Sequence, residues 1–260
     1  MTIIDRIICK KNNTMIRILA FICLTSFAYL TTNAQGTAFG IKGGPTLAVQ
    51  KWDNSDRDPL FAYHFIASVE SLAEEGEVSI FAQAGYHTRG SAIRIRGGAP
   101  YIDPITMTDR IFRGSTTKYD FQNLGLSIGV KQRFTATAGN LYYLLGLRGE
   151  YNIKNNLDQF EEFPLFIQSG FPSQAGVQDF TFGFIFGGGF ELALSEFIDA
   201  TIELTINPDF TKQYFQPTFN NAFDTFTGNN DRTIPELNIR NNSIELTVGF
   251  RFKRVVEYVD

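Results

Sequence analysis

The residues with the most evident chemical capacity are the only two histidines of the chain, His64 and His87. A histidine beside a hydroxyl group or a water molecule can activate it for attack on a substrate. Ser91 and Glu70 are the candidate partners of such a histidine, although Glu70 is expected to lie too deep. The simpler interpretation, and the one we expect, is that both histidines belong to an interior polar network.

No cofactor or metal is predicted. Two histidines without a cluster of carboxylates are too few ligands for a typical metal site. The glycines at 187–189 lie inside a strand pattern with no helix after them, so they do not form a phosphate-binding loop. The asparagine-rich segment 220–231 could offer oxygen ligands to Ca²⁺, but a solvated loop tip is expected there.

These residues belong to a chain in which apolar and other side chains alternate along most of its length. Such alternation predicts β-strands, because successive side chains of a strand point to opposite faces. The segment DFTFGFIFGGGFELAL, residues 179–194, shows the pattern most clearly, and no helical period competes with it. Eight strands are predicted, at 37–49, 60–71, 77–95, 118–134, 141–153, 179–194, 198–210 and 242–253.

Short and long connections alternate between these strands. The connections at 50–59, 96–117, 154–178 and 211–241 are long, and those between them are short. Outer-membrane barrels combine an even number of strands with short turns at one end and long loops at the other. The pattern therefore predicts an all-β chain that forms an eight-stranded antiparallel transmembrane β-barrel, an up-and-down meander with both termini in the periplasm.

The two faces of the predicted strands differ in the opposite sense to those of a soluble barrel. One face is apolar and is expected to contact lipid, while the other carries charges of both signs. Eight strands enclose only enough room for side chains, so these charges should pair and fill the interior. The residues predicted to face lipid are Phe180, Phe182, Phe184, Phe186, Phe190, Leu204, Leu246, Phe250 and Phe252. The predicted interior network contains Lys42, His64, His87, Arg89, Arg133, Arg148, Glu150, Glu191, Glu203, Glu245 and Arg251.

Aromatic residues are predicted to form two girdles at the levels of the lipid headgroups. Trp52, the only tryptophan, is expected to anchor the first long loop at the interface. The girdle near the long loops would contain Phe61, Tyr63, Tyr119, Phe121, Tyr151 and Phe180. The girdle near the short turns would contain Phe39, Phe134, Tyr142, Tyr143 and Phe197.

The N-terminal segment has the features of an export signal. From Met15, a candidate true start, Arg17 precedes a largely apolar run at 18–30 and a small-residue cleavage site after Ala34. We predict a cleaved signal peptide at 1–34, a barrel at 35–254 and a short periplasmic tail at 255–260. Export through the Sec pathway would then deliver the chain to the outer membrane.

Three motifs resemble the outer-membrane β-barrel domain family common in Bacteroidetes, the PorT-like group. They are Lys-Gly-Gly in AQGTAFGIKGGPTLA, Tyr-x-x-(Arg/Lys)-Gly in FAQAGYHTRGSAI, and Gly-Phe-Arg-Phe in LTVGFRF. The resemblance covers about residues 35–253 and carries no catalytic residues. It implies an outer-membrane barrel and, from the member that names the group, an accessory role in type IX secretion. Such barrels usually end near the final aromatic residue, whereas KRVVEYVD follows Phe252 here, as a tail or as a longer last strand.

The sequence thus predicts a non-enzymatic outer-membrane protein with a structural or adhesive role, or one accessory to a surface or secretion assembly. Its expected partners are outer-membrane lipid and, through the aromatic long loops, other envelope or secretion proteins. A net charge of only −4 offers no basic field for nucleic acid. The alternatives are a small porin-like channel and a lipid-A-modifying hydrolase or acyltransferase that uses His64 or His87.

Overall fold

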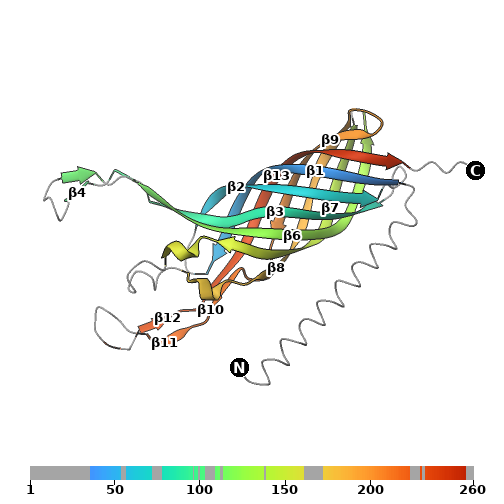
Figure 1. The fold of residues 1–260 in the computed structure, drawn as a ribbon. Coiled ribbons are helices and arrows are strands. Elements are labelled where there is room, and N and C mark those ends of the chain that lie inside the picture. Colours follow the sequence, from blue (N-terminus) through green and yellow to red (C-terminus); the bar gives the residue numbers. More distant parts are fainter. Residues whose placement is uncertain are drawn as a thin grey trace, which may run out of the picture.

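The computed structural model is a closed ring of eight antiparallel strands (Figure 1). Each strand pairs with the next along the chain, and the last pairs with the first, which closes the ring. This arrangement confirms the predicted meander. The barrel strands are β1 (Gly36–Trp52), β2 (Asp58–Ser71), β3 (Val78–Ile95), β6 (Ser115–Ala136), β7 (Gly139–Asn155), β8 (Phe180–Ala193), β9 (Ile198–Pro208) and β13 (Leu237–Val255).

The structure describes residues 36–255 except 54–56, 72–77, 96, 99, 103–108, 112–113, 138, 161–171, 223–228 and 230–231. The predicted signal peptide and nearly all of the predicted tail therefore lie outside the described residues. Within these ranges, no helix has the length and apolar character needed to cross a membrane. The shorter elements are β4 (Pro100–Ile102), β5 (Asp109–Ile111), β10 (Tyr214–Gln216), β11 (Phe219–Ala222), β12 (Arg232–Ile234) and the 3₁₀ turns η1 (Leu157–Phe160) and η2 (Gln174–Gly176).

The two ends of the barrel differ in their connections. Gly36 pairs with Val255, so both ends of the described chain lie at the end that carries the short turns (Figure 1). At the opposite end β1 continues to Trp52 and β2 begins at Asp58, so the first predicted long loop has only residues 53–57. That prediction was wrong because the polar residues taken for loop continue the β1–β13 ladder. The last strand likewise runs to Val255, past the predicted end at 253.

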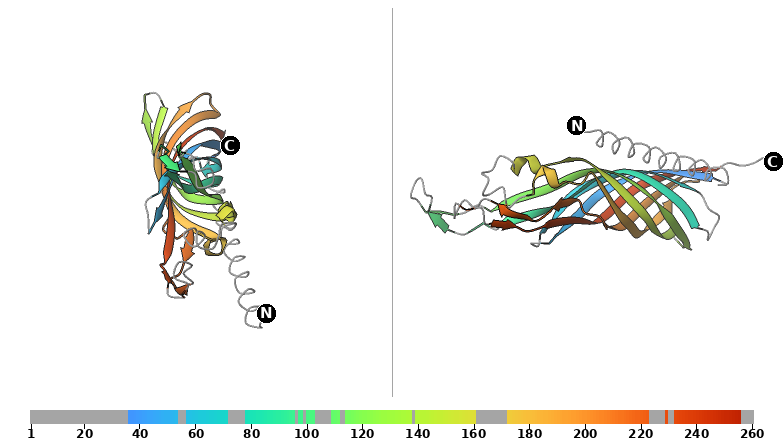
Figure 2. Two further views of the ribbon diagram at one scale, coloured as in Figure 1. Left: turned by 90° about the vertical axis from the view of Figure 1, so that its left-hand side faces the viewer. Right: turned by 90° about the horizontal axis from the view of Figure 1, so that it is seen from below.

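Strands β3 and β6 extend beyond the rim as a two-stranded ribbon (Figures 1 and 2). Their pairing continues to Ile95 and Ser115, whereas β2 leaves β3 at Ala92 and β7 leaves β6 at Phe121. The small β4–β5 sheet follows at the far end of the ribbon. The loop end of the molecule therefore projects well beyond the barrel itself.

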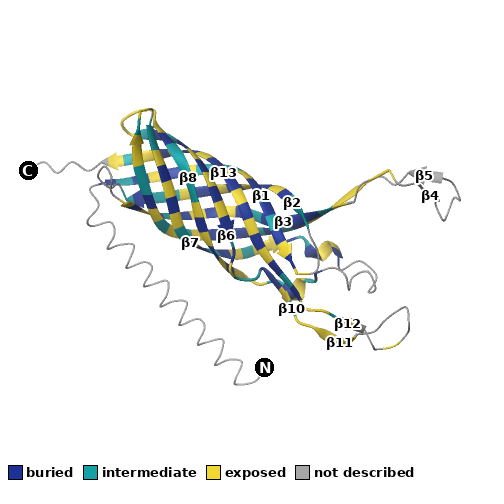
Figure 3. Ribbon diagram, turned by 180° about the vertical axis from the view of Figure 1, so that it is seen from behind, coloured by how far each residue is buried: buried dark blue, intermediate teal, exposed yellow. Residues whose placement is uncertain are grey.

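The barrel has an apolar outer surface and a polar interior, which appears as alternating exposed and buried residues in Figure 3. On β13 the outward residues from Ile244 to Phe252 are 42–54% exposed, whereas the intervening Glu245 and Thr247 are 1% exposed. Nine residues of a strand that rises about 3.3 Å per residue and tilts by about 40° span roughly 20 Å along the axis. This height is close to the apolar band of ~25 Å found in outer-membrane barrels.

The residues predicted to face lipid all lie on this outer surface, in the ladder positions that alternate with buried ones. Only Phe190 is half-buried, because its ring lies against Gly139, where an added Cβ would be 2.7 Å from the ring. Large aromatic side chains commonly cover a glycine of the neighbouring strand in this way.

The two predicted girdles are only partly correct. Tyr119, Phe121 and Tyr142 are buried in the interior, and so is Trp52 at the end of β1. On β6 the odd-numbered residues from 119 to 125 are buried and point inward. Tyr119 and Phe121 belong to this set, so they lie inside the barrel. The other girdle residues are exposed, at Phe39, Phe61, Tyr63, Phe134, Tyr143, Tyr151, Phe180 and Phe197.

Candidate functional site

The barrel interior is filled by paired charges. In the described residues, seven acidic and seven basic side chains join in its ion pairs, so this network is balanced when the histidines are neutral. All the charged residues predicted for the interior are among them, and Glu70, Lys131, Asp199, Asp209 and Lys253 join them. The acids are Glu70, Glu150, Glu191, Asp199, Glu203, Asp209 and Glu245, and the bases are Lys42, Arg89, Lys131, Arg133, Arg148, Arg251 and Lys253.

One cluster of ion pairs lies toward the short-turn end. Glu191 accepts hydrogen bonds from Lys131 at 2.6 Å, from Arg133 at 2.9 Å and from Arg251 at 2.7 Å. Glu70 accepts from Arg133 and from Lys131. Each carboxylate thus faces two or three cations, which compensates for the loss of water around buried charges.

A second cluster lies nearer the long loops and is centred on Arg89, whose side chain is fully buried. Its guanidinium donates to Glu150 at 2.6 Å and to Glu245 at 2.7 Å. Arg148 lies 3.3 Å from Glu150 and donates to Asp209 at 2.6 Å. This central cluster joins β3, β7, β13 and the end of β9 across the lumen, which fixes these strands relative to one another.

The two histidines face each other across β2 and β3, with stacked rings whose centroids are 5.9 Å apart. His64 hydrogen-bonds to Thr46 at 2.8 Å and to Thr247 at 2.9 Å. His87 bonds to Glu245 at 3.0 Å. The hydroxyl groups therefore contact one histidine and the carboxylate contacts the other. Among the residues that the structure describes, neither histidine bonds both to an acid and to a hydroxyl group, as a catalytic triad requires.

The two candidate partners of the histidines, Ser91 and Glu70, make their hydrogen bonds elsewhere, and Glu70 lies deep in the barrel as expected. Ser91 donates to Gln50 at 2.7 Å, and Glu70 belongs to the cluster near the short turns. Parity placed Ser91 inside but could not show that its hydroxyl group bonds to Gln50. In the part of the chain that the structure describes, no group of three His, Cys, Asp or Glu side chains could hold a metal ion.

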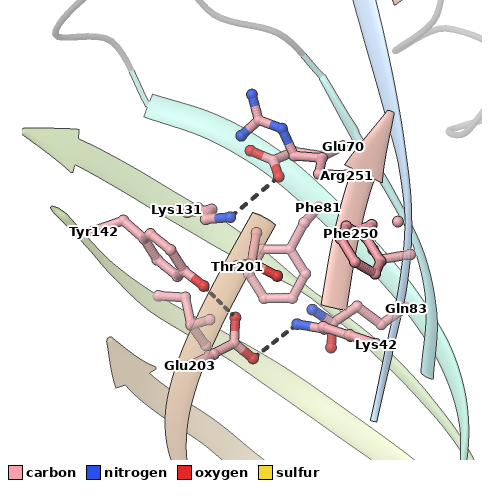
Figure 4. Close-up of a pocket in the computed structure, with 13 residues that line it drawn as sticks. Lys42, Glu70, Phe81, Gln83, Lys131, Tyr142, Thr201, Glu203, Phe250 and Arg251 are labelled. Atoms are coloured by element: carbon pink, nitrogen blue, oxygen red, sulfur yellow. Dashed lines mark hydrogen bonds and ion pairs between the residues drawn. The ribbon is translucent and has the colours of Figure 1, made fainter. Parts of the chain in front are cut away.

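A small cavity lies beside the short-turn cluster, and Glu70, Lys131 and Arg251 form part of its lining (Figure 4). Its volume of about 30 Å³ is enough for about one or two water molecules. Glu203 lies at its wall, where it accepts from Lys42 at 2.7 Å and from the Tyr142 hydroxyl at 3.0 Å. The side-chain oxygen of Gln83, Oε1, is buried there without a hydrogen-bond partner among the described residues, which fits a bridging water.

Toward the long loops, side-chain amides cross the lumen. Gln50 donates to Asn241 at 3.0 Å, and Asn241 donates to Gln213 at 2.9 Å. Asn123 donates to the same Gln213 oxygen at 3.4 Å and accepts from Asn152 at 2.8 Å. This amide layer was not predicted, because the members named for the interior network were charged residues and histidines. The signal was present, since Gln50, Asn123 and Asn241 share the inward parity of their strands.

The mouth of the barrel is closed by a hydrophobic cluster, which we call the mouth cluster. Tyr119 lies at its centre, 5.2 Å from Trp52 and 4.9 Å from Phe160 between ring centroids. Strands and loops both contribute, so η1 and β10 are folded back onto the barrel. Its members are Trp52, Tyr119, Phe121, Leu157, Phe160, Tyr214, Leu237 and Ile239.

Arg57 covers the mouth cluster from the 53–57 loop. Its guanidinium carbon lies 3.9 Å from the centre of the Trp52 ring system, a distance typical of cation–π contacts. Burial against these rings lowers the pKa of Arg57 from its ordinary value.

Comparison with known proteins yields likeness to solved structures alone. No protein-family model and no curated protein sequence matches the chain. The attachment invasion locus protein Ail of Yersinia pestis, in complex with the heparin analogue sucrose octasulfate, is 12% identical over 84% of this chain and 99% of its own, with a TM-score of 0.39. The Neisserial surface protein A is 10% identical over 83% and 97%, with a TM-score of 0.39. The outer-membrane protease OmpT from Escherichia coli is 10% identical over 85% and 98%, with a TM-score of 0.40. The assignment of the fold rests on the closed strand pairing described above.

Proposed function

We propose that this chain is a non-enzymatic outer-membrane protein that spans the membrane as a closed barrel and acts through the structures at its long-loop end. The observation that carries the proposal is the inverted distribution of side chains, with an apolar outer band around an interior of paired charges. In water such a surface would expose a large apolar area to solvent, whereas in a bilayer it faces hydrocarbon.

The membrane location is tested by the electrophoretic mobility of the outer-membrane fraction with and without boiling. A closed barrel resists detergent until it is heated, so the apparent mass should change on boiling. A protein found in the periplasm, with a mobility that boiling does not change, would contradict the proposal.

A conducting role is disfavoured by the filling of the lumen. The central cluster, the amide layer and the mouth cluster follow one another along the axis, and the described cavity holds only about one or two waters. The purified protein in a planar bilayer should therefore give no steady current. Regular unitary conductance steps would favour the porin-like alternative.

The non-enzymatic role has its own test in the mass of lipid A. Expression of the barrel should leave that mass unchanged, because among the described residues neither histidine bonds both to an acid and to a hydroxyl group. A mass change that disappears in His64→Ala or His87→Ala would overturn this part of the proposal.

The proposed working surface is the β3–β6 ribbon with β4 and β5 at its tip, together with the β11–β12 hairpin at the same end (Figure 1). Such a surface suits adhesion or the binding of another envelope protein. The PorT-like resemblance supports the second choice, an accessory role in a secretion assembly.

Replacement of residues 96–114 by a short turn removes the proposed working surface but leaves every strand pairing of the ring in place. The variant therefore tests the function of this surface without a change in the barrel. We expect an unchanged mobility shift on boiling, with loss of cell adhesion or of cargo secretion. A shortened protein that supports both functions as well as the full chain would exclude the ribbon as the working surface.

A further inference from the structure

Two cations lie side by side on the outer surface at the long-loop end. Lys51 on β1 is directly opposite Arg240 on β13, and both side chains are exposed. Lys51 follows Val49 and Leu47 on the outward face of β1, and Arg240 precedes Asn242 and the apolar band of β13. The pair therefore sits at the upper edge of the apolar band.

This juxtaposition of like charges is unfavourable on its own. The Cβ atoms of directly opposite residues lie about 4.5–5.5 Å apart, and like charges at that spacing repel. Neither Lys51 nor Arg240 has an ion pair with any residue in the described ranges. The nearest described acid along β1 is Asp53, and its carboxylate accepts a hydrogen bond from Asn238 at 2.6 Å.

The pair differs from the cations inside the barrel and from Lys212. Those inside the barrel are matched one for one by carboxylates, and Lys212 outside it lies 3.7 Å from Glu236. Lys118 on β6 and Lys154 on β7 are not directly opposite each other, and the carboxylate of Asp120 is close enough to interact with both charges. Since no carboxylate in the described part of the chain pairs with Lys51 or Arg240, an external anion could balance their charge.

We infer that Lys51 and Arg240 bind the phosphate of a phosphorylated lipid of the outer leaflet. The inference rests on the proposed function, because it requires the apolar band to lie in a bilayer. Acyl chains packed against the band would place their headgroup at its upper edge, at the level of these two residues. A guanidinium can bind two phosphate oxygens at once, and a lysine from the adjacent strand can reach a third.

Native mass spectrometry of the purified barrel, titrated with lipid A and with dephosphorylated lipid A, tests the inference. The wild type should bind the phosphorylated form more tightly on the order of tenfold, as the loss of two solvent-exposed charge pairs would give. The variant Lys51→Gln/Arg240→Gln should bind both forms alike. The matched control Lys118→Gln/Lys154→Gln removes the same charge from the same rim and should keep the preference.

Two outcomes would overturn the inference. One is a preference that survives in Lys51→Gln/Arg240→Gln or falls equally in the control, which would indicate diffuse charge attraction. The other is displacement of lipid A by inorganic phosphate alone, which would indicate a site for free anions. The change in gel mobility on boiling, measured on each variant, separates these results from a failure of the barrel to fold in a membrane.

Discussion

Replacement of Arg89 by methionine should test whether the paired interior holds the barrel together. Arg89 is fully buried and donates to Glu150 at 2.6 Å and to Glu245 at 2.7 Å. Methionine fills a comparable length of the lumen without charge. The Arg89→Met variant would therefore leave two buried carboxylates with weaker partners rather than a large void.

The expected loss follows from the partners that remain. Removing one member of a buried ion pair typically lowers the free energy of unfolding by about 3–5 kcal/mol. Glu150 keeps Arg148 at 3.3 Å and Glu245 keeps His87 at 3.0 Å, so we expect the lower end, about 3 kcal/mol. Urea unfolding of the barrel refolded into lipid vesicles measures this loss through the emission of Trp52, the only tryptophan, which is buried in the mouth cluster.

A second variant, Arg89→Met/Glu245→Gln, tests whether the loss of stability comes from an unpaired buried carboxylate. It removes one of the stranded carboxylates and returns the central cluster to its original net charge. We expect it to recover at least about half of the loss, because an unpaired buried charge costs more than an amide in the same place. Two results would contradict this expectation. One is a free energy of unfolding for Arg89→Met within about 0.5 kcal/mol of the wild type, and the other is a double variant no more stable than Arg89→Met.

Three further predictions concern the apolar outer band, the mouth cluster and two glycines of the barrel strands. Leu204→Arg, in the middle of the band, should lower the free energy of unfolding in vesicles by about 2–4 kcal/mol, and Leu192→Arg near the short turns by less than about 1 kcal/mol; equal losses would contradict the placement of the bilayer. Phe160→Ala should weaken docking of η1 by about 3 kcal/mol, seen as faster proteolysis between β7 and β8 and a red shift of tryptophan emission. A Cβ at Gly129 would lie 2.2 Å from a backbone carbonyl but one at Gly149 only 3.3 Å from a ring. Gly129→Ala should therefore lower the free energy of unfolding in urea by about 1–3 kcal/mol more than Gly149→Ala does.

The fold could be predicted from sequence because the property that decides it is local. Alternation along a strand is visible in a short segment such as 179–194, and the spacing of the turns gives the strand order. The same local rule located the inward residues from Lys42 to Arg251. Strand ends were less predictable, because Gln50 and Lys51 look like loop residues until the partner strand offers hydrogen bonds.

The contacts within the site could not be predicted, because they depend on the stagger between strands and on loops that fold back. Parity shows that Ser91 points inward but not that Gln50 on another strand lies beside it. Trp52 and Phe160 are far apart in sequence, and only the return of η1 to the mouth brings both against Tyr119. An aromatic side chain near a strand end is equally compatible with a lipid interface and with a buried plug, so Tyr119 was placed on the wrong side.

The packing of the mouth implies that the long connections are not equivalent. The 96–114 segment leaves the barrel on the β3–β6 ribbon, whereas 157–160 and 214 contribute to the cluster that closes the lumen. A change at Leu157 or Phe160 is expected to expose the aromatic cluster and the amide layer beneath it, whereas none of the described residues of 96–114 belongs to that cluster. Substitution and insertion in 96–114 are therefore expected to cost little stability, since exposed loop tips tolerate both. A partner that binds the ribbon would leave the mouth closed, whereas one that displaces η1 would open it.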